Sequence, residues 1–314
     1  MEALKTVFMG TPDFAATILR YLVADERGMV AAYTQRDKVS GRGQVLVSSP
    51  VKKTARELGI TVIQPRNFRS EETVAELSQL GPDLILVAAY GQILPQAVLD
   101  IPRHGCLNVH PSLLPRFRGV SPVAAAILAG DEFTGVTLML LDPGTDTGPI
   151  LAQAQVTVSP DDTTGSLTDK LARIGAQLLL GVLPLWIKGN IAPRPQDEAG
   201  ATYCKKLSKE DGEIDWALPA VDVWRRVRAF HPWPGAFTAW QGKQLKILAA
   251  KPLLAAAPVT PGRVIDLHDK AVGLGIGTGQ GVLGVVTLQL EGKKAMPAGD
   301  FLRGQRGIID AVLG

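Results

Sequence analysis

The sequence predicts an α/β protein with a doubly wound, Rossmann-like parallel sheet domain, followed by a smaller β-barrel domain. Strand-like and helical patterns alternate over residues 4–141, as in doubly wound folds. The nearly all-apolar run Leu84–Ala89 is typical of a strand buried on both faces of a parallel sheet. Beyond residue 200, short strand-like runs separated by glycine-rich turns replace this alternation, which favours a small barrel. The length of 314 residues suits two domains.

The elements of the first domain follow in order along the chain. The expected strands are the short apolar runs Leu4–Met9, Met29–Tyr33, Ile60–Ile63, Leu84–Ala89, Cys106–Val109 and Val136–Leu141. The expected helices lie between or after them, at residues 14–22, 50–58, 71–80, 123–129 and 167–187. Thr11 is expected to cap the first helix and Pro12 to occupy its first turn. Such sheets bind ligands at the carboxyl ends of their strands.

The second half of the chain begins with the segment Gly189–Gly200, which is rich in proline and polar residues and is expected to be a linker. A helix is expected over Val221–Phe230. The expected strands of the barrel are Ala236–Trp240, Gln244–Ala249, Arg263–Asp266, Ala271–Ile276 and Val282–Leu290. We therefore predict a catalytic domain over residues 1–189, a linker over 190–207 and a C-terminal domain over 208–314.

Composition and charge limit the class of protein. Hydrophobic residues make up 46% of the chain and charged residues 20%, as in soluble globular proteins. We expect neither a membrane-spanning helix nor a secretion signal. Two cysteines are too few for a disulfide framework, so a cytoplasmic location is expected. The net charge is +3, yet residues 201–314 carry 15 Lys and Arg against 10 Asp and Glu. This excess fits either an anionic partner such as nucleic acid or a solvated basic surface.

One glycine pattern resembles a dinucleotide-binding fingerprint but has the wrong context. Gly279–Gly284 leads into a strand pattern at Val285–Leu288, whereas a phosphate-binding loop leads into a helix. A hairpin turn is therefore predicted there. The strand-to-helix turn at Gly10 lacks the three-glycine fingerprint, so no nucleotide cofactor is expected. No metal site is expected either, because His104 and His110 have no credible companion ligands.

The most informative segment of the chain is Asn108–Gly119. A strand ends near Val109 and a proline-rich loop follows. Asn108 and His110 share one strand face, because side chains alternate along a strand. This places an amide and an imidazole at the carboxyl edge of the sheet, where an amide can bind an oxyanion and an imidazole can move a proton. A catalytic role for both is therefore predicted.

A second polar loop, Asp142–Pro149, follows the strand Val136–Leu141. Its carboxylates have two interpretations. They can serve turn formation alone, or Asp146 can face His110, orient the ring and stabilise its charged form. The sequence spacing is compatible with neighbouring strand ends and leaves both open.

The chain resembles the folate-dependent formyltransferases, nearly from end to end. The first domain carries the resemblance in the segments Met9–Ala15, Ala89–Pro95, Asn108–Gly119, Asp142–Pro149 and Ser49–Lys52, the last following Gly41-Arg42-Gly43. The Asn-x-His-x-Ser-Leu-Leu-Pro element is shared by the wider superfamily. The members that act on aminoacylated tRNA are distinguished by C-terminal motifs, which correspond here to Lys206–Lys209, Ile214–Trp216, Arg228–Pro234 and Gly292–Met296.

This resemblance implies a reaction and a set of site residues. The reaction is formyl transfer from 10-formyltetrahydrofolate to the α-amino group of methionine on initiator tRNA, for translation initiation. Asn108, His110 and Asp146 match the family's catalytic positions. The positions that match its folate-binding elements are Ser112, Leu113, Leu114, Pro115, Tyr90, Gly91, Ile93 and Leu94.

The resemblance also implies an OB-like C-terminal domain that holds the tRNA backbone, and a basic loop around Arg42 that grips the acceptor arm. The expected tRNA-binding residues are Arg42, Lys206, Lys209, Arg225, Arg228, Lys293 and Lys294. A monomer is expected.

Pro111 departs from the tRNA-acting members, many of which have a small residue there; relatives that act on small substrates have proline. Two alternatives follow. One is a formyltransferase for a small amine, a sugar amine or a purine precursor, which shares the catalytic element but gives no reason for the basic second domain. The other is a non-catalytic RNA-binding protein, which explains the second domain but not Asn108, His110 and Asp146.

Overall fold

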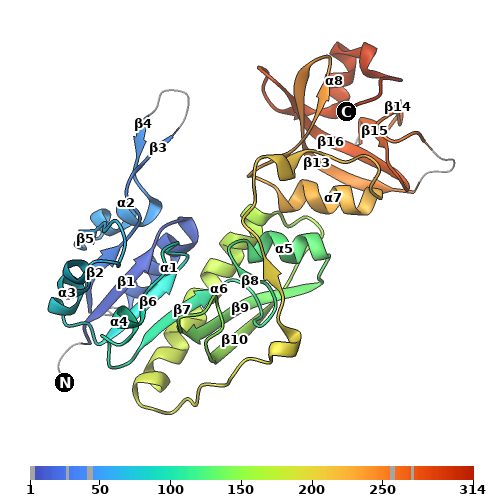
Figure 1. The fold of residues 1–314 in the computed structure, drawn as a ribbon. Helices are drawn as coiled ribbons and strands as arrows, with labels where there is room; N and C mark the ends of the chain where they lie inside the picture. The colour runs from blue at the N-terminus through green and yellow to red at the C-terminus, as the bar shows by residue number, and fades with distance from the viewer. Residues whose placement is uncertain (1–3, 26–27, 41–44, 255–258, 270–271) are drawn as a thin grey trace. The chain divides into compact units, whose positions relative to one another are not determined.

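The computed structural model describes residues 4–25, 28–40, 45–254, 259–269 and 272–314 (Figure 1). The chain divides into two compact units. The first unit comprises Met1–Pro122, Phe133–Thr157 and Thr168–Cys204; the second comprises Val123–Glu132, Val158–Leu167 and Lys205–Gly314. Each unit therefore includes segments that are separated in the sequence.

The first unit is built on a seven-stranded sheet with the strand order β10-β9-β7-β6-β1-β2-β5. Its strands are β1 (Thr6–Gly10), β2 (Met29–Tyr33), β5 (Val62–Ile63), β6 (Leu84–Ala88), β7 (Cys106–His110), β9 (Phe133–Leu140) and β10 (Ile150–Thr157). The five strands from β7 to β5 run parallel, whereas β9 and β10 add an antiparallel edge. The predicted parallel α/β sheet is confirmed, and β10 is the strand that the sequence analysis missed.

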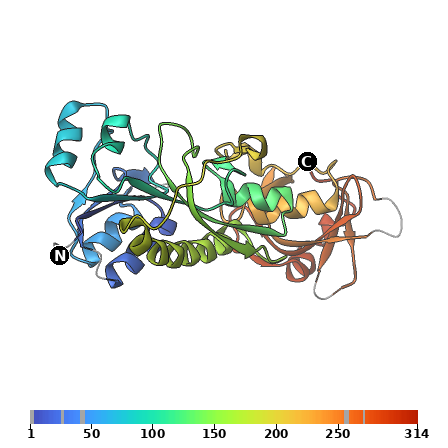
Figure 2. The ribbon, with the colours of Figure 1, turned by 90° about the horizontal axis from the view of Figure 1, so that it is seen from below.

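Helices cover both faces of this sheet (Figure 2). They are α1 (Asp13–Ala24), α2 (Pro50–Glu57) and α6 (Thr164–Ile187) on one face, and α3 (Glu71–Gln79) and α4 (Gln96–Leu99) on the other. The fully buried strands β1 and β6 form the centre of the core. On the α3 side, Val7 and Ile85 pack in one apolar cluster with Leu77, Val98 and Cys106. This packing explains the continuous apolar runs of the central strands.

Two short strand pairs lie beside the main sheet. The hairpin of β3 (Lys38–Ser40) and β4 (Val45–Val47) was not predicted. The predicted tRNA-binding residue Arg42 lies between these two strands in the sequence and outside the described residues. A second pair, β8 (Arg118–Gly119) and β11 (Tyr203–Cys204), is parallel and joins residues far apart in the sequence. The predicted linker also contains a short 3-10 helix, Glu198–Gly200.

Two details of the helices differ from the sequence-based expectations. The Thr11 hydroxyl does not cap α1; it donates to the Tyr90 carbonyl (2.8 Å), and Pro12 occupies the cap position. α6 is one continuous helix despite Gly175 and Pro184. A Cβ at position 175 would lie 2.8 Å from Val109, so the glycine allows α6 to approach the sheet closely.

α6 is long and apolar enough to be a candidate membrane span by length and composition alone, contrary to the expectation that the chain has none. Buried residues such as Leu171, Ala176 and Leu179 lie along it, as in core helices of soluble proteins.

The second unit contains a six-stranded antiparallel sheet with the order β12-β13-β16-β15-β14, and β17 pairs with β16. The strands are β12 (Ala236–Trp240), β13 (Lys243–Leu253), β14 (Val264–Asp266), β15 (Leu274–Gly277), β16 (Val282–Leu290) and β17 (Met296–Pro297). The long pair β13 and β16 has irregular register near Ala249, and such bulges increase strand curvature. The predicted change from alternating strands and helices to a second part built on short strands is therefore confirmed.

The helices of the second unit include α7 (Ala220–Ala229), α8 (Ala298–Gly304), and the 3-10 turns Glu210–Gly212 and Arg306–Ile308. α5 (Pro122–Ala129) also belongs to the second unit, except for its first residue, Pro122. The glycine pattern Gly279–Gly284 forms the turn between β15 and β16 and the start of β16, with Gly281 at a φ of 84°. The hairpin prediction for this pattern is therefore confirmed.

Candidate active site

The site is built at the carboxyl end of β7, which lies between β6 and β9 in the sheet. Asn108 and His110 alternate with Val109 along this strand, so they share the face of Cys106. Asn108 is 7% exposed and His110 is 4% exposed. Buried polar groups need hydrogen-bond partners, and here the neighbouring loops provide them.

The loop between β9 and β10 provides the carboxylate. Asp142 shapes this loop: it accepts the Gly144 N–H (3.1 Å) and the Thr147 hydroxyl (2.7 Å). The turn interpretation therefore fits Asp142. Asp146 instead turns towards β7, with a backbone φ of 54° that is unusual for a residue other than glycine. The two carboxylates of one loop thus have different tasks.

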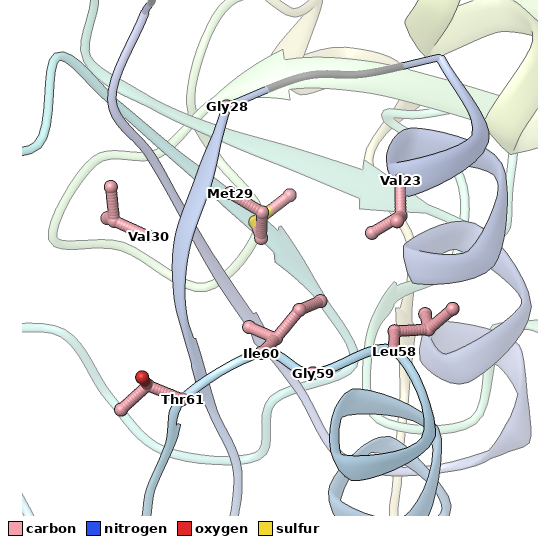
Figure 3. Close-up of a pocket in the computed structure, with 8 residues that line it drawn as sticks. All are labelled: Val23, Gly28, Met29, Val30, Leu58, Gly59, Ile60 and Thr61. Atoms are coloured by element: carbon pink, nitrogen blue, oxygen red, sulfur yellow. The ribbon is translucent and has the colours of Figure 1, made fainter.

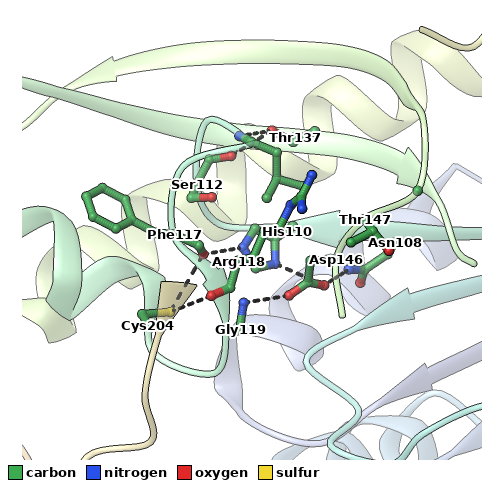
Figure 4. Close-up of polar contacts among 12 residues, drawn as sticks. Asn108, His110, Ser112, Phe117, Arg118, Gly119, Thr137, Asp146, Thr147 and Cys204 are labelled. Carbon is green, nitrogen blue, oxygen red and sulfur yellow. Dashed lines mark hydrogen bonds and ion pairs between the residues drawn. The ribbon is translucent and has the colours of Figure 1, made fainter. Parts of the chain in front are cut away.

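Asn108, His110 and Asp146 converge (Figure 4). The Asp146 Oδ1 atom lies 3.5 Å from Asn108 Nδ2 and 3.6 Å from His110 Nδ1. Both separations are longer than an ideal hydrogen bond. The three residues are therefore neighbours with loose contacts, and a shift of about half an ångström suffices to tighten them, as occurs when catalytic sites bind substrate.

The segment Phe117–Gly119 fixes the other sides of the histidine and the carboxylate. The His110 Nε2 atom lies 3.1 Å from the Phe117 carbonyl oxygen, and a carbonyl only accepts, so Nε2 carries a proton. The Gly119 N–H donates to Asp146 Oδ2 at 2.8 Å. Nδ1 is then the ring nitrogen that faces Asp146, and in the neutral form of the ring it holds the lone pair. The sequence analysis included this segment in a motif but missed its role.

The predicted folate-binding loop Ser112–Pro115 is anchored by hydrogen bonds to Thr137 of β9 and within the loop region. The Ser112 hydroxyl, 0% exposed, donates to the Arg116 carbonyl (2.7 Å). The buried Thr137 hydroxyl donates to the Ser112 carbonyl (2.7 Å) and accepts the Leu114 N–H (3.0 Å). Leu114 packs in a small apolar cluster with Met139 and Ile150. These contacts favour a loop-shaping role for the Ser112 and Leu114 side chains; Leu113 and Pro115 are half-buried.

The second predicted folate element lies after β6. The Thr11 hydroxyl and the Gln35 side-chain amide donate to the Tyr90 carbonyl, at 2.8 and 3.1 Å. Burial raises the pKa of the Tyr90 phenol well above its usual range, and its hydroxyl has no hydrogen-bond partner among the described residues. Leu94 is buried in the core, whereas Ile93 is exposed.

A groove of about 1090 Å³ lies beside this element. Gly91, Gln92 and Ile93 line it, together with Phe68 and the first turns of α3. Two of the predicted folate positions, Gly91 and Ile93, therefore face a space large enough for a drug-sized ligand.

A second pocket of about 440 Å³ lies at the opposite edge of the sheet, where β2 and β5 begin (Figure 3). Val23, Met29, Leu58 and Ile60 are among its lining residues. Since ligands of doubly wound sheets bind at the carboxyl ends of the strands, we do not assign this pocket to the site.

The residues predicted to bind tRNA differ in exposure. Lys206, Lys209, Lys293 and Lys294 are exposed in the second unit. Arg225 forms an ion pair with Asp222 (3.2 Å) on α7. Arg228 is only 8% exposed; it donates to the Ser159 and Asp162 carbonyls (both 3.3 Å) and lies 3.9 Å from the Trp224 ring centroid. This burial favours a structural role for Arg228 over a phosphate contact.

The two thiols have different surroundings. Cys106 is buried, and burial raises its pKa to about 12, which fits the prediction of an inert thiol. The half-buried Cys204, also with a raised pKa, lies 3.3 Å from the Arg118 carbonyl oxygen, so it contacts the segment that holds His110. Within the described part of the chain, His, Cys, Asp and Glu form no cluster of three suited to a metal ion.

Comparison with known proteins gives matches to both parts of the chain. Residues 4–183 match the model of the family described as formyl transferase, and residues 206–306 match that of the formyl transferase C-terminal domain. The chain is 49% identical over 315 residues to the methionyl-tRNA formyltransferase of Dehalococcoides mccartyi, with 100% of both chains covered. It is 50% identical to the methionyl-tRNA formyltransferase of a Roseiflexus species, with 96% of this chain and 93% of that protein covered.

Solved structures share the fold at lower identity. HypX of Aquifex aeolicus, in complex with tetrahydrofolic acid, aligns over 99% of this chain and 49% of its own, with a TM-score of 0.63 and 21% identity. The sugar 3N-formyltransferase WlaRD aligns over 94% of this chain and 100% of its own, with a TM-score of 0.64 and 18% identity. Both comparisons support the two-part architecture.

Proposed function

We propose that this chain, which belongs to the formyl transferase family, transfers a formyl group from 10-formyltetrahydrofolate to the α-amino group of methionine on initiator tRNA. The observation that carries the proposal is the convergence of Asn108, His110 and Asp146 in a chain that matches methionyl-tRNA formyltransferases over its whole length. Gly91 and Ile93, which line the groove of about 1090 Å³, are two of the positions proposed to bind the folate co-substrate.

The reaction needs one new bond, one broken bond and one proton transfer. The neutral amine attacks the formyl carbon, and the carbonyl oxygen becomes an oxyanion. The bond from the formyl carbon to the folate N10 then breaks, and the proton lost by the amine goes to N10. A free α-amino group has a pKa near 7.7–8.0, so a useful fraction is neutral at physiological pH.

Asn108 is the proposed oxyanion donor. Its Nδ2 amide has two hydrogens, one of which is directed towards Asp146 Oδ1 at 3.5 Å. The second is the one we assign to the oxyanion. Loss of a single donor of this kind costs about 100- to 1,000-fold in rate.

His110 and Asp146 are the proposed proton-handling pair. Nε2 donates to the Phe117 carbonyl, so Nδ1 is the atom that can take a proton, and Asp146 Oδ1 lies 3.6 Å from it. A proton on Nδ1 is stabilised by the facing carboxylate, which the Gly119 N–H holds in place. Proton transfer by a positioned side chain contributes about 100- to 10,000-fold.

The second unit is proposed to hold the tRNA backbone through Lys206, Lys209, Lys293 and Lys294, which are exposed. Arg42 and Arg225 remain proposed contacts, whereas the burial of Arg228 favours a structural role for it. Phosphate contacts give affinity that depends on salt and not on sequence. Residues 1–189 are proposed as the catalytic domain, 190–207 as the linker and 208–314 as the tRNA-binding domain, in a monomeric cytoplasmic enzyme.

A small-amine formyltransferase is the second candidate, because Pro111 matches relatives with small substrates. A formylation assay with labelled 10-formyltetrahydrofolate separates the two. We expect label on methionine of charged initiator tRNA and none on free methionine or amino sugars. Equal or faster labelling of a free amine would contradict the tRNA assignment. His110→Ala is the negative control.

A further inference from the structure

Arg118 is fully buried, at 0% exposure. In the sequence it lies between Phe117, whose carbonyl contacts His110, and Gly119, whose N–H contacts Asp146. Its guanidinium pairs with Glu198 in a fork, with distances of 2.9 and 2.7 Å. It also donates to the Gln196 side-chain oxygen (2.9 and 3.1 Å) and to the Tyr203 hydroxyl (3.1 Å). A buried cation needs partners of this quality to offset its desolvation.

All three partners come from residues 196–203, within the segment predicted to be a linker. The main chain joins the same two segments: the Arg118 N–H donates to the Thr202 carbonyl (2.8 Å), and the Phe117 N–H donates to the Thr202 hydroxyl (2.8 Å). The parallel pair β8–β11 continues this interaction, with Gly119 opposite Cys204. The segment 196–204 is therefore packed on the residues that hold the site, in the same compact unit.

Gln196 extends the interaction to the loop between β9 and β10, which carries Asp146. Its side-chain nitrogen donates to the Asp146 carbonyl (2.9 Å) and to the Gly148 carbonyl (2.7 Å), while its oxygen accepts from Arg118. The Asp146 backbone, in its left-handed conformation, is thus held by a side chain from the segment after α6. Such a conformation persists only where the surroundings hold it.

We propose that Arg118 and Gln196 are positioning residues, and that residues 196–204 complete the active site. Arg118 fixes the Phe117 carbonyl, which sets the proton on His110 Nε2, and the Gly119 N–H, which aims Asp146 (Figure 4). Gln196 fixes the main chain of Asp146. Both residues act through the segments that hold His110 and Asp146. The catalytic part of this inference rests on the proposed function.

The test separates positioning from simple support of the fold. Arg118→Met and Gln196→Leu remove the hydrogen bonds, Arg118→Lys keeps the charge without the fork, and Arg20→Met, which removes an exposed ion pair with Glu57, is the matched control. Thermal unfolding establishes the folded fraction of each variant. Two readouts follow on folded protein: kcat against KM for charged tRNA, and the proton resonance of His110 Nε2–H, assigned by its loss in His110→Gln.

Arg118→Met and Gln196→Leu should lower kcat by up to about 100-fold with little change in KM, as misplacement of catalytic groups by about an ångström does. They should also shift or broaden the His110 resonance, and Arg118→Lys should be intermediate. If Arg118→Met does not fold, Gln196→Leu decides the matter, because Gln196 is only half-buried.

Unchanged kcat and an unchanged resonance in folded Gln196→Leu overturn the proposal, as does a kcat loss that equals the loss of folded protein. The resonance needs no substrate. A wild type that fails to formylate tRNA would therefore count against the proposed function, and the resonance would still decide on positioning.

Discussion

Two regions of the molecule are built in opposite ways. One is the proposed catalytic edge of the first unit, formed by Asn108, His110 and Asp146. The other is the basic surface of the second unit, with the exposed residues Lys206, Lys209, Lys293 and Lys294. At the catalytic edge, Asn108 and His110 are almost fully buried, and each lies near Asp146. Lys293 and Lys294 of the second unit are exposed. Buried groups that share partners are expected to act as one unit, whereas exposed cations act on a polyanion nearly independently. The difference indicates where single substitutions should abolish function and where they should only weaken it.

The largest effect is expected at the catalytic edge. His110→Ala or Asn108→Ala should lower the single-turnover rate by at least about 100-fold, because each removes a group proposed to act in the transition state. The measurement is formyl transfer with folate and charged tRNA both saturating. Circular dichroism should show that the fold is retained. A folded variant that transfers formyl at the wild-type rate would remove that residue from the mechanism.

A smaller, graded effect is expected on the basic surface. The double substitution Lys293→Ala with Lys294→Ala should weaken tRNA binding. The affinity should also depend less on salt: the negative slope of log affinity against log salt should shrink in magnitude by about 0.7–0.9 for each phosphate that the protein no longer neutralises. Folate affinity should not change. Lys251→Ala, another exposed lysine of the second unit, is the control. A salt slope equal to that of the wild type would show that these lysines do not bind phosphates.

The Thr137 hydroxyl, which anchors the predicted folate-binding loop Ser112–Pro115, allows a test through stability. Thr137→Val removes the hydroxyl that serves Ser112 and Leu114 and leaves buried polar groups unpaired. The free energy of unfolding should fall by about 1–3 kcal/mol. Urea denaturation measures it, with exposed Thr157→Val as the control. A change no larger than that of the control would show that the loop does not need this anchor.

The base of the β3–β4 hairpin gives a pH-dependent test. Lys52 Nζ lies 2.6 Å from Asp37 Oδ2, and hydrogen bonds from Lys52 and Gln64 lower the pKa of Asp37. A carboxylate with a lowered pKa stabilises the fold above its ordinary pKa, and this contribution is lost as the pH falls through the folded-state value. The stability difference between wild type and Lys52→Met should therefore be larger at pH 7 than at pH 3. A difference independent of pH would contradict this account.

The sequence predicted the central elements because their signals are local. The predicted strands Leu84–Ala89 and Cys106–Val109 form β6 and β7 with ends that differ by one residue, and alternation alone put Asn108 and His110 on one face. β10 was missed, because five of its eight residues are alanine or polar, as suits an edge strand.

The remaining parts of the site depend on interactions between residues distant in the sequence. The Phe117 carbonyl and the Gly119 N–H are main-chain groups, which no residue type reveals. Gln196 lies in a proline-rich segment that reads as a linker, and only the folded chain shows that it reaches Asp146. Arg228 shows the converse, since a basic residue in a basic segment proves to be buried.

The central claim is that Asn108, His110 and Asp146 form one site for formyl transfer. Its most direct test is the single-turnover rate of formylation of charged initiator tRNA by His110→Ala, Asp146→Ala and the double variant. Residues that act as a unit are strongly non-additive, so the double variant should be about as slow as the slower single variant. A double variant whose loss is the product of the two single losses would contradict the claim.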